Sequence, residues 1–358
     1  MVQGFGPLTL GLASASLAAS AAGVWFSIRL AHRVGAIDVP NERSSHSVPT
    51  PRMGGVPMVA AAVVAYGGWS LWADGALFPA GAVAYGMVFA LVMSALGFWD
   101  DLSGLSPLFR FLIQLSGSVL VLRAAAGMLP AEPVLWSAVE LPRAVWIPVG
   151  ALWVVWLLNL YNFMDGIDGL AGGEAAVAAS FFFLVFAWHG ESGWAVANLF
   201  IAAASMGFLV HNWPPAKVFM GDTGSAFLGA FFGMQSVAAA LTTPVPFVVL
   251  ALPFSNFILD TTATLLGRIW RGEKWYTAHR SHYYQRMTNL GMSHARVTGL
   301  ELVSVALSCL AALLYLRSGV QGKIVIISSV LFGFIAAGIW ISKKSLLSSD
   351  TSPITGQE

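Results

Sequence analysis

Long apolar segments, each about the length of a membrane-spanning helix, follow one another along the chain. A helix needs about 20 mostly apolar residues to cross a bilayer, and eleven segments meet this requirement. They lie near residues 7–28, 55–73, 79–99, 108–128, 144–161, 170–189, 193–210, 223–241, 244–267, 297–316 and 323–342. The pattern predicts an all-α fold, a polytopic integral membrane bundle of about eleven transmembrane helices. We expect residues 1–342 to form one membrane-embedded domain.

The basic residues between these segments indicate the orientation of the bundle. Eleven is an odd number, so the two chain ends are expected on opposite sides of the membrane. Loops after odd-numbered segments, together with the C-terminal tail, hold 14 of the 18 Lys and Arg residues, and the other loops hold 4. Cytoplasmic loops collect Lys and Arg, which places the N-terminus outside. Residues 343–358, rich in Ser, Thr, Pro and Gly, are expected to form a short, disordered cytoplasmic tail.

The composition supports a membrane protein and excludes several other classes. Hydrophobic residues make up 57% of the chain and charged residues 10%, too few charges for a soluble enzyme, a disordered chain or a coiled coil. The net charge of +1 provides no field for binding nucleic acid. The single cysteine, Cys309, excludes an internal disulfide and a Cys-based zinc site. No basic residue precedes the first segment, so we expect it to be retained rather than cleaved.

Five acidic residues lie where the predicted helices meet the cytoplasmic face. Asp100 and Asp101 end the third segment, Asp165 and Asp168 follow the fifth, and Asp222 begins the eighth. Ionisable groups at the membrane boundary are costly and usually face a partner, a water-filled cavity or a functional site. Oxygen ligands without a His or Cys cluster favour a hard cation, Mg²⁺ or alternatively Mn²⁺.

Each acidic motif also has a purely structural explanation. Adjacent residues on a helix point apart, so Asp100 and Asp101 cannot both bind one metal ion without a break in the helix, and the pair could simply face water. Asp165 and Asp168 are each followed by Gly and could form turns. Asp222 could cap the N-terminus of its helix, where the dipole favours a negative charge.

The predicted cytoplasmic loops also carry basic and histidine side chains. These could be ordinary flanks of membrane helices, which are enriched in positive charge. A carboxylate-bound metal beside Arg and His side chains is, however, typical of phosphoryl-transfer sites, where catalysis is largely the positioning of the reactants and the neutralisation of their charge. The candidates for sugar or phosphate recognition are Arg43, His46, Arg52, His279, Arg280 and His282.

Taken together, these motifs resemble the polyprenyl-phosphate N-acetylhexosamine-1-phosphate transferases, glycosyltransferase family 4. The resemblance covers about residues 40–286, with the motifs in the family's order. They are Pro40 to His46 with Pro49 to Arg52, the Asp100-Asp101 pair, Asn159 to Ala171, Asn212 to Ser225, and His279 to Arg286.

The resemblance implies an activity and a role for each matched residue. The reaction would transfer a sugar-1-phosphate from a UDP-N-acetylhexosamine to undecaprenyl phosphate in a lipid membrane, with release of UMP and a requirement for Mg²⁺. Asp222 matches the magnesium ligand, Asp100 the aspartate that deprotonates or positions the lipid phosphate, and Asp101 its partner near the metal. The nucleotide and diphosphate pocket is matched by Asn162, Asp165, Asp168, Asn212 and Lys217.

The last cytoplasmic loop separates branches of this family. It lacks the triple-His motif of the muramyl-pentapeptide branch. A second difference from that branch lies after the Asp pair: only Leu102 to Leu108 stand between the pair and Arg110, and that branch's run of basic residues is absent. The loop looks closer to the branch that initiates O-antigen, whose donors include UDP-N-acetyl-fucosamine, -quinovosamine and -glucosamine. The resemblance implies an inner-membrane protein with its active site on the cytoplasmic face, and some family members are dimers.

Three other functions fit parts of the sequence. A secondary transporter would use Asp100, Asp165, Asp168 and Asp260 as coupling groups, but transporter sites lie near the midplane and only Asp260 is deep. Asp260 could equally form a buried hydrogen bond with a neighbour such as Asn256 or Thr261. A CDP-alcohol phosphatidyltransferase is disfavoured because its Asp-Gly-x-x-Ala-Arg signature is not in the sequence. A membrane scaffold without catalysis is the third alternative.

Overall fold

The computed structural model describes residues 6–40, 45, 47–76, 81–127, 142–274 and 279–350. Nearly all of these residues are helical. The helices are α1 (Pro7–Val34), α2 (Gly55–Asp74), α3 (Ala82–Ser103), α4 (Pro107–Ala126), α5 (Arg143–Met164), α6 (Leu170–Trp188), α7 (Ser192–Asn212), α8 (Gly221–Thr242), α9 (Phe247–Ala251), α10 (Ser255–Trp270), α11 (Tyr283–Asn289), α12 (His294–Arg317) and α13 (Val320–Asp350). Two short antiparallel strands, β1 (Ile37–Asp38) and β2 (Thr50–Pro51), lie after α1.

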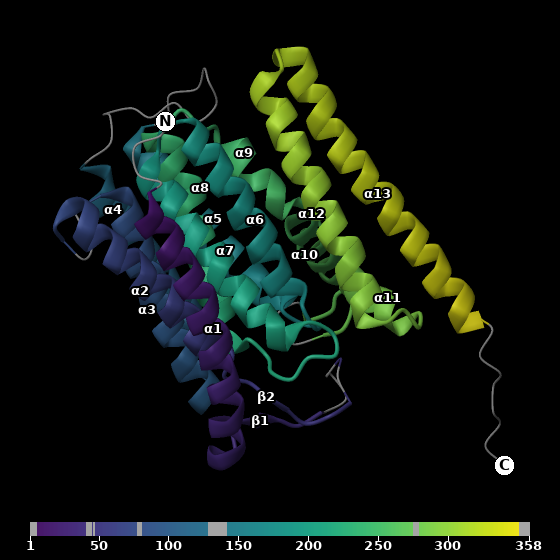
Figure 1. Ribbon diagram of the computed structural model, residues 1–358. Coiled ribbons are helices and arrows are strands. Elements are labelled where there is room, and N and C mark those ends of the chain that lie inside the picture. Colours follow the sequence, from purple (N-terminus) through teal and green to yellow (C-terminus); the bar gives the residue numbers. More distant parts are fainter. Residues whose placement is uncertain are drawn as a thin grey trace.

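The number of membrane-crossing segments predicted from the sequence is confirmed. Within the described ranges, eleven helical segments are long and apolar enough to cross a membrane. The ninth, Phe247–Trp270, joins α9 and α10 through a 3₁₀ turn, η1 (Leu252–Phe254), which contains Pro253 and so lacks one amide hydrogen of the helical ladder. α1 begins at one end of the bundle and α13 ends at the opposite end, as an odd number requires (Figure 1).

α8 forms the centre of the bundle, and the C-terminal helices form its edge. In the most apolar part of α8, 94% of the residues are buried, compared with 11% in α13. α8 packs against α3 and α5, while α13 contacts mainly α12 (Figure 1). An apolar helix that is mostly exposed in a membrane protein faces lipid. The residues at the N-terminus of α8 are therefore held by neighbours on several sides.

α3 and α8 approach each other so closely that their backbones touch. A Cβ atom at Gly97 of α3 would lie 2.3 Å from the carbonyl oxygen of Asp222. Next to this contact, the Ser94 hydroxyl donates a hydrogen bond of 3.0 Å to the carbonyl oxygen of Thr223. The last turn of α3 and the first turn of α8 are thereby brought together, and both turns carry predicted site residues.

The boundary between the membrane domain and the predicted tail differs from the expectation. α13 continues to Asp350, so residues 343–350 are helical where we expected the start of a disordered tail. The first Pro after Lys344 is Pro353, and no Gly lies between them, so nothing in this stretch stops the helix. Residues 351–358 lie outside the described part of the chain.

We expect Gly97→Ala to destabilise the protein. The added methyl group must push the α3 and α8 backbones apart, and overpacking of this kind costs about 1–3 kcal/mol. Thermal unfolding of the detergent-solubilised protein measures the effect. Gly86→Ala, on the same helix, is the matched control, because its Cβ would lie 3.7 Å from Met234 Cβ, an ordinary van der Waals distance. Equal unfolding midpoints for the two variants would show that the helices can separate without cost.

Candidate active site

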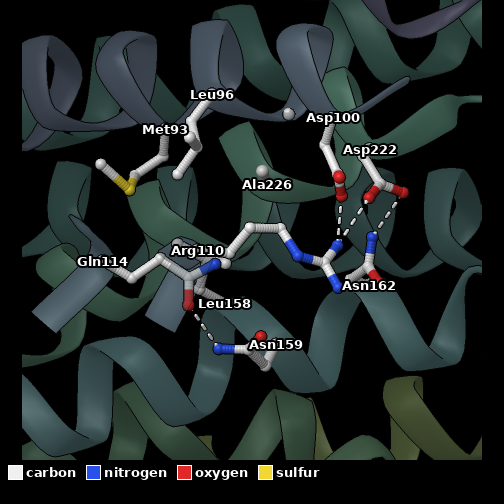
Figure 2. A pocket seen from close by; sticks show the side chains of 11 residues that line it. Met93, Leu96, Asp100, Arg110, Gln114, Leu158, Asn159, Asn162, Asp222 and Ala226 are labelled. Carbon is white, nitrogen blue, oxygen red and sulfur yellow. Dashed lines mark hydrogen bonds and ion pairs between the residues drawn. The ribbon is translucent and has the colours of Figure 1, made fainter. Parts of the chain in front are cut away.

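A guanidinium group lies between two of the predicted catalytic carboxylates. Arg110, in the first turn of α4, points between Asp100 from the last turn of α3 and Asp222 from the first turn of α8 (Figure 2). Its Nη1 atom is 3.2 Å from Asp222 Oδ2 and also contacts Asp100 Oδ2. The Asp100 side chain is nearly buried, whereas the side chains of Arg110 and Asp222 are each 32% exposed. These two groups are therefore open to a ligand.

Both carboxylates are held in place by further hydrogen bonds. The backbone N–H of Leu105 donates to Asp100 Oδ1 at 2.6 Å. Asn162 Nδ2, at the end of α5, donates to Asp222 Oδ1 at 2.8 Å and to Ser225 Oγ at 3.1 Å. Asp222 thus contacts Asn162 through one oxygen and Arg110 through the other (Figure 2).

The side chain of Asp101 caps helix α8. Its carboxylate accepts hydrogen bonds from the backbone N–H groups of Asp222 and Thr223, each at 3.2 Å, and from the Thr223 hydroxyl at 3.1 Å. Arg52 Nη2 donates to the backbone carbonyl oxygen of Asp101 at 2.8 Å. Asp101 therefore positions Asp222. Arg52 lies beside Asp101, and its role in sugar or phosphate recognition stays a prediction.

A pocket beneath the carboxylates joins a charged end to an uncharged end. It lies between α3, α4, α5 and α8, and in Figure 2 the acidic residues and Asn162 line one end while Met93, Leu96 and the amide of Gln114 line the other. Gln114 and Asn159 are joined across it by a hydrogen bond of 2.8 Å. The lining residues are Met93, Leu96, Gly97, Asp100, Arg110, Gln114, Leu158, Asn159, Asn162, Asp222 and Ala226.

The donor set fits a hard divalent cation that is completed by substrate and water. One nitrogen atom of Arg110 already contacts both Asp100 and Asp222, so a positive charge fits between them. Among the described residues, no three His, Cys, Asp or Glu side chains form a preformed metal cluster. Mg²⁺ typically takes one or two protein carboxylates and fills its remaining positions with waters and substrate phosphates. Asp222 and Asp100 are the two residues that would hold it.

The loop after α5 has two aspartates in different environments. Burial, and secondarily the negative charges of Asp222 and Asp101, raise the pKa of Asp165 to about 7. For Asp168, burial acts in the same direction, but hydrogen bonds from His294 and from the backbone N–H of Ala216 outweigh it and hold the pKa below its usual value. Asp168 Oδ1 is 3.2 Å from His294 Nδ1, and its Oδ2 accepts from Ala216 N at 3.0 Å.

The remaining predicted pocket residues connect loops instead of lining the pocket. Asn212 Oδ1 accepts from the N–H of Gly169 at 3.0 Å, and Asn212 Nδ2 donates to the Val218 carbonyl oxygen at 2.8 Å. The backbone N–H of Lys217 donates to the His211 carbonyl oxygen at 2.8 Å. Of the five residues predicted to contact nucleotide or diphosphate, Asn162 lines the pocket. The nucleotide-binding roles of all five stay predictions.

The last loop is anchored by a carboxylate inside the membrane bundle. Asp260 of α10 contacts His282 Nδ1 at 3.2 Å, and it accepts from the N–H groups of Tyr283 and Tyr284 at 3.0 and 3.3 Å. From the sequence, a buried hydrogen bond and a catalytic role were equally expected for Asp260. The structure shows hydrogen bonds, but the partners differ from Asn256 and Thr261, which the sequence analysis considered. The Tyr284 hydroxyl then donates to the Phe163 carbonyl oxygen at 3.0 Å and connects this loop to the end of α5.

The three predicted recognition residues of the last loop lie together at the start of α11. The His279 ring centroid is 4.9 Å from that of His282, and Arg280 lies between them in sequence. Burial, followed by the charges of His282 and Arg268, lowers the pKa of His279 to about 4, so this ring is neutral at neutral pH. Arg43 and His46, the other two predicted recognition residues besides Arg52, lie outside the described residues.

Arg110 is the main site residue that the sequence analysis missed. It was counted only among the basic residues of the predicted cytoplasmic loops. The available signal was its position, since it is the sole basic residue between the Asp pair and the apolar body of the fourth segment, ten residues after Asp100. Ser225, which shares Asn162 with Asp222, was also missed.

The fold and the site together define a polytopic membrane protein with a cluster of charged residues at one end of its helical bundle. Residues 83–240 match the family described as glycosyl transferase family 4. The decaprenyl-phosphate N-acetylglucosaminephosphotransferase of Mycolicibacterium smegmatis is 30% identical over 321 residues, which cover 80% of this chain and 76% of that protein. The chain belongs to this family, the polyprenyl-phosphate N-acetylhexosamine-1-phosphate transferases.

Two further relatives represent different branches. The probable undecaprenyl-phosphate N-acetylglucosaminyl 1-phosphate transferase of Bacillus subtilis is 29% identical over 276 residues, or 74% of this chain and 73% of that protein. The phospho-N-acetylmuramoyl-pentapeptide-transferase of Thermosynechococcus vestitus is 33% identical over 193 residues, or 51% of this chain and 50% of that protein. The similarity to the first relative extends over more of both chains.

We expect Asp260→Ala to loosen the last loop. The substitution leaves the N–H groups of Tyr283 and Tyr284 without their acceptor, and an unpaired buried polar group costs about 1–3 kcal/mol. Amide hydrogen exchange at these two residues should become about 10- to 100-fold faster. Thr264→Val, which removes only a hydroxyl that donates to Asp260, is the control. Unchanged exchange in Asp260→Ala would show that the loop is held by other contacts.

Proposed function

We propose that the protein transfers an N-acetylhexosamine-1-phosphate from a UDP-sugar to undecaprenyl phosphate, at the cytoplasmic face of the inner membrane. UMP is released, and a lipid-linked diphosphate sugar remains in the membrane. Membership of the transferase family and the names of the relatives support a polyprenyl phosphate acceptor and an N-acetylhexosamine donor. The 14-to-4 distribution of basic residues supports the cytoplasmic face.

One observation carries this proposal: Arg110, Asp100 and Asp222 meet at the charged end of a pocket whose other end is uncharged and includes the apolar side chains of Met93 and Leu96. An acceptor that is both a phosphate and a lipid needs these two environments side by side. The phosphate matches the charged end, and the first part of the prenyl chain matches the apolar lining formed by residues such as Met93 and Leu96.

The reaction forms and breaks one bond at the same phosphorus atom. An oxygen of the lipid phosphate attacks the β-phosphorus of the donor, and the bond from that phosphorus to the bridging oxygen breaks, so UMP leaves with its electron pair. A divalent cation, Mg²⁺ or Mn²⁺, when bound by Asp222 and Asp100 would neutralise the diphosphate charge. Asp100 is placed to accept a proton from the acceptor phosphate or to orient it, because Leu105 N fixes one of its oxygens.

Arg110 supplies the second positive charge of the site. Its guanidinium contacts Asp100 and Asp222 and is 32% exposed, so it can reach a bound phosphate without leaving the pocket. A guanidinium presents several N–H donors in a fixed geometry that suits phosphate oxygens. Arg110 therefore holds the two carboxylates near each other and offers donors to the developing charge on the reacting phosphorus group.

The structural role of Asp260 favours the transferase over the transporter alternative. Asp260 was the only predicted coupling group deep in the bundle, and it is occupied by the N-terminus of α11 and by His282. The last loop, whose sequence resembles that of the O-antigen branch, is held beside the end of α5 by these contacts. We propose that this loop, through His279, Arg280 and His282, recognises the donor sugar, and that the product initiates an O-antigen or a related surface polysaccharide.

We expect detergent-purified protein to release UMP only when undecaprenyl phosphate, Mg²⁺ and one UDP-N-acetylhexosamine are all present. UDP-N-acetylglucosamine is the first donor to test, followed by the fucosamine and quinovosamine derivatives. Asp222→Asn and Asp100→Asn should lower turnover by about 10²- to 10³-fold, because each removes a preorganised charge next to the reacting phosphate. Addition of EDTA should abolish release in the unsubstituted protein.

Two outcomes would contradict the proposed function. Near-normal turnover in both Asp variants would refute the site, even if the reaction itself were observed. No acceptor-dependent UMP release from folded protein with any donor of the panel would refute the reaction. Uptake of a solute into vesicles that depends on Asp260 and not on Asp222 would favour a transporter instead.

We expect Arg110→Gln to lower turnover by about 10²-fold or more, and Arg110→Lys to recover part of this loss. Gln keeps a polar side chain but removes the charge, whereas Lys restores the charge without the guanidinium geometry. The measurement is the rate of UMP release at saturating donor. Arg296→Gln is the control, because this exposed residue in the first turn of α12 lies outside the pocket. An equal loss of turnover in Arg110→Gln and in Arg296→Gln would indicate a general effect of removing a positive charge, and it would contradict a specific role for Arg110.

A further inference from the structure

A second group of buried acidic residues lies where α12 packs against α6 and α10. Glu174, one turn into α6, is 0% exposed. Asn256, at the start of α10, and Glu301, on α12, both lie within interaction range of Glu174. None of these three residues lines the pocket of the candidate active site. The proposed reaction leaves this group without a role.

The hydrogen bonds in this group leave several acceptors without a donor. Asn256 Nδ2 donates to Glu301 Oε2 at 2.8 Å. Both carboxylate oxygens of Glu174, and also Asn256 Oδ1, are buried without a hydrogen-bond partner in the described part of the chain. Asn256 is itself only 6% exposed. One additional hydrogen-bond donor, placed between Glu174 and Asn256, would satisfy an oxygen on each side.

The surrounding titratable groups do not supply positive charge. Among the described residues, those found to interact with Glu174 or Glu301 are Tyr161 on α5, Asp260 on α10, Tyr284 on α11 and Cys309 on α12. None of these four residue types carries a positive charge. Two ionised carboxylates at this position would therefore repel each other in an apolar environment, where even one uncompensated charge is very costly.

We propose that Glu174 is a proton-binding site: it is a carboxylic acid in the folded protein, and its O–H donates to Asn256 Oδ1. Asn256 Nδ2 in turn donates to Glu301, so the three side chains form one hydrogen-bonded chain. The proton is the missing donor, and it removes one of the two negative charges. Carboxyl groups that lie close together in a protein commonly hold one proton between them, because both cannot ionise.

The position of this proton connects it to the last loop. Asp260, which holds the start of α11, lies one helical turn after Asn256 on α10. Glu174 follows the loop 165–169 by one turn of α6. The protonated chain from Glu174 through Asn256 to Glu301 thus joins α6, α10 and α12, and two of these helices carry the attachment points of the loops: α6 follows loop 165–169, and α10 carries Asp260. Glu174 is a positioning residue for these loops and does not touch substrate.

Infrared spectroscopy of the detergent-solubilised full chain tests this proposal directly. At neutral pH we expect a carbonyl stretch of a protonated carboxylic acid that shifts when glutamate is labelled with ¹³C. The band should disappear in Glu174→Gln and persist in Glu273→Gln, since Glu273 is an ion-paired residue that should be ionised. No ¹³C-sensitive acid band in the unsubstituted protein, or a band that survives in Glu174→Gln, would overturn the proposal.

Thermal unfolding provides a second, independent test. Glu174→Gln replaces the O–H donor with an N–H donor and should keep the unfolding midpoint close to that of the unsubstituted protein. Glu174→Ala removes the donor and should lower the midpoint by about 5 °C or more. If Glu174→Gln unfolds as early as Glu174→Ala, the proposal is wrong. A third outcome concerns cations. If sodium raised the unfolding midpoint of the unsubstituted protein more than a large organic cation did, and if Glu174→Gln lost this difference, the site would bind a metal cation in place of the proton. That result would also overturn the proposal.

Discussion

The capping of α8 by Asp101 is the interaction on which the candidate active site depends. The first N–H groups of a helix have no partner within the helix, and here two of them, with the Thr223 hydroxyl, donate to a carboxylate from α3. This contact fixes the start of α8 against the end of α3. Because consecutive residues on a helix point apart, the cap directs Asp100 to the opposite side, toward Asp222. Asp101 therefore builds the site, and Asp100, the residue before it, is the one we propose to take part in the chemistry.

The position of the site at one end of the bundle follows from the cost of charge in a membrane. Asp100 and Asp222 share Arg110, so the group carries less net charge than its two carboxylates alone. The backbone contact at Gly97 keeps water and lipid from separating α3 and α8 at this point. The same contact leaves the exposed faces of Arg110 and Asp222 as the accessible part of the group. The phosphate groups of the proposed substrates would meet these exposed charges.

The sequence predicted the fold well because the length of an apolar segment and the bilayer thickness are directly related. It could not predict which residues pair across helices. Asp168 and Asn212 lie in family motifs, yet their side chains bind His294, Ala216, Gly169 and Val218 in neighbouring segments. Arg110 belongs to the site because a short turn brings the start of α4 against the end of α3. Apart from its place shortly after the Asp pair, nothing in the local sequence distinguishes it from a basic residue that flanks a membrane helix.

The buried carboxyl groups of this protein are stabilised in three ways that depend on depth and partners. At the end of the bundle, where water is near, Asp100 and Asp222 use a guanidinium. Deeper, Asp260 remains a hydrogen-bond acceptor because backbone N–H groups and His282 surround it. Among the described residues, Glu174 has neither an Arg nor a ring of N–H donors around it, and the side chains that interact with it are another acid, Glu301, and the amide of Asn256. A proton is the smallest positive charge that such an enclosed position can take, and it also provides the hydrogen-bond donor that the neighbouring residues lack.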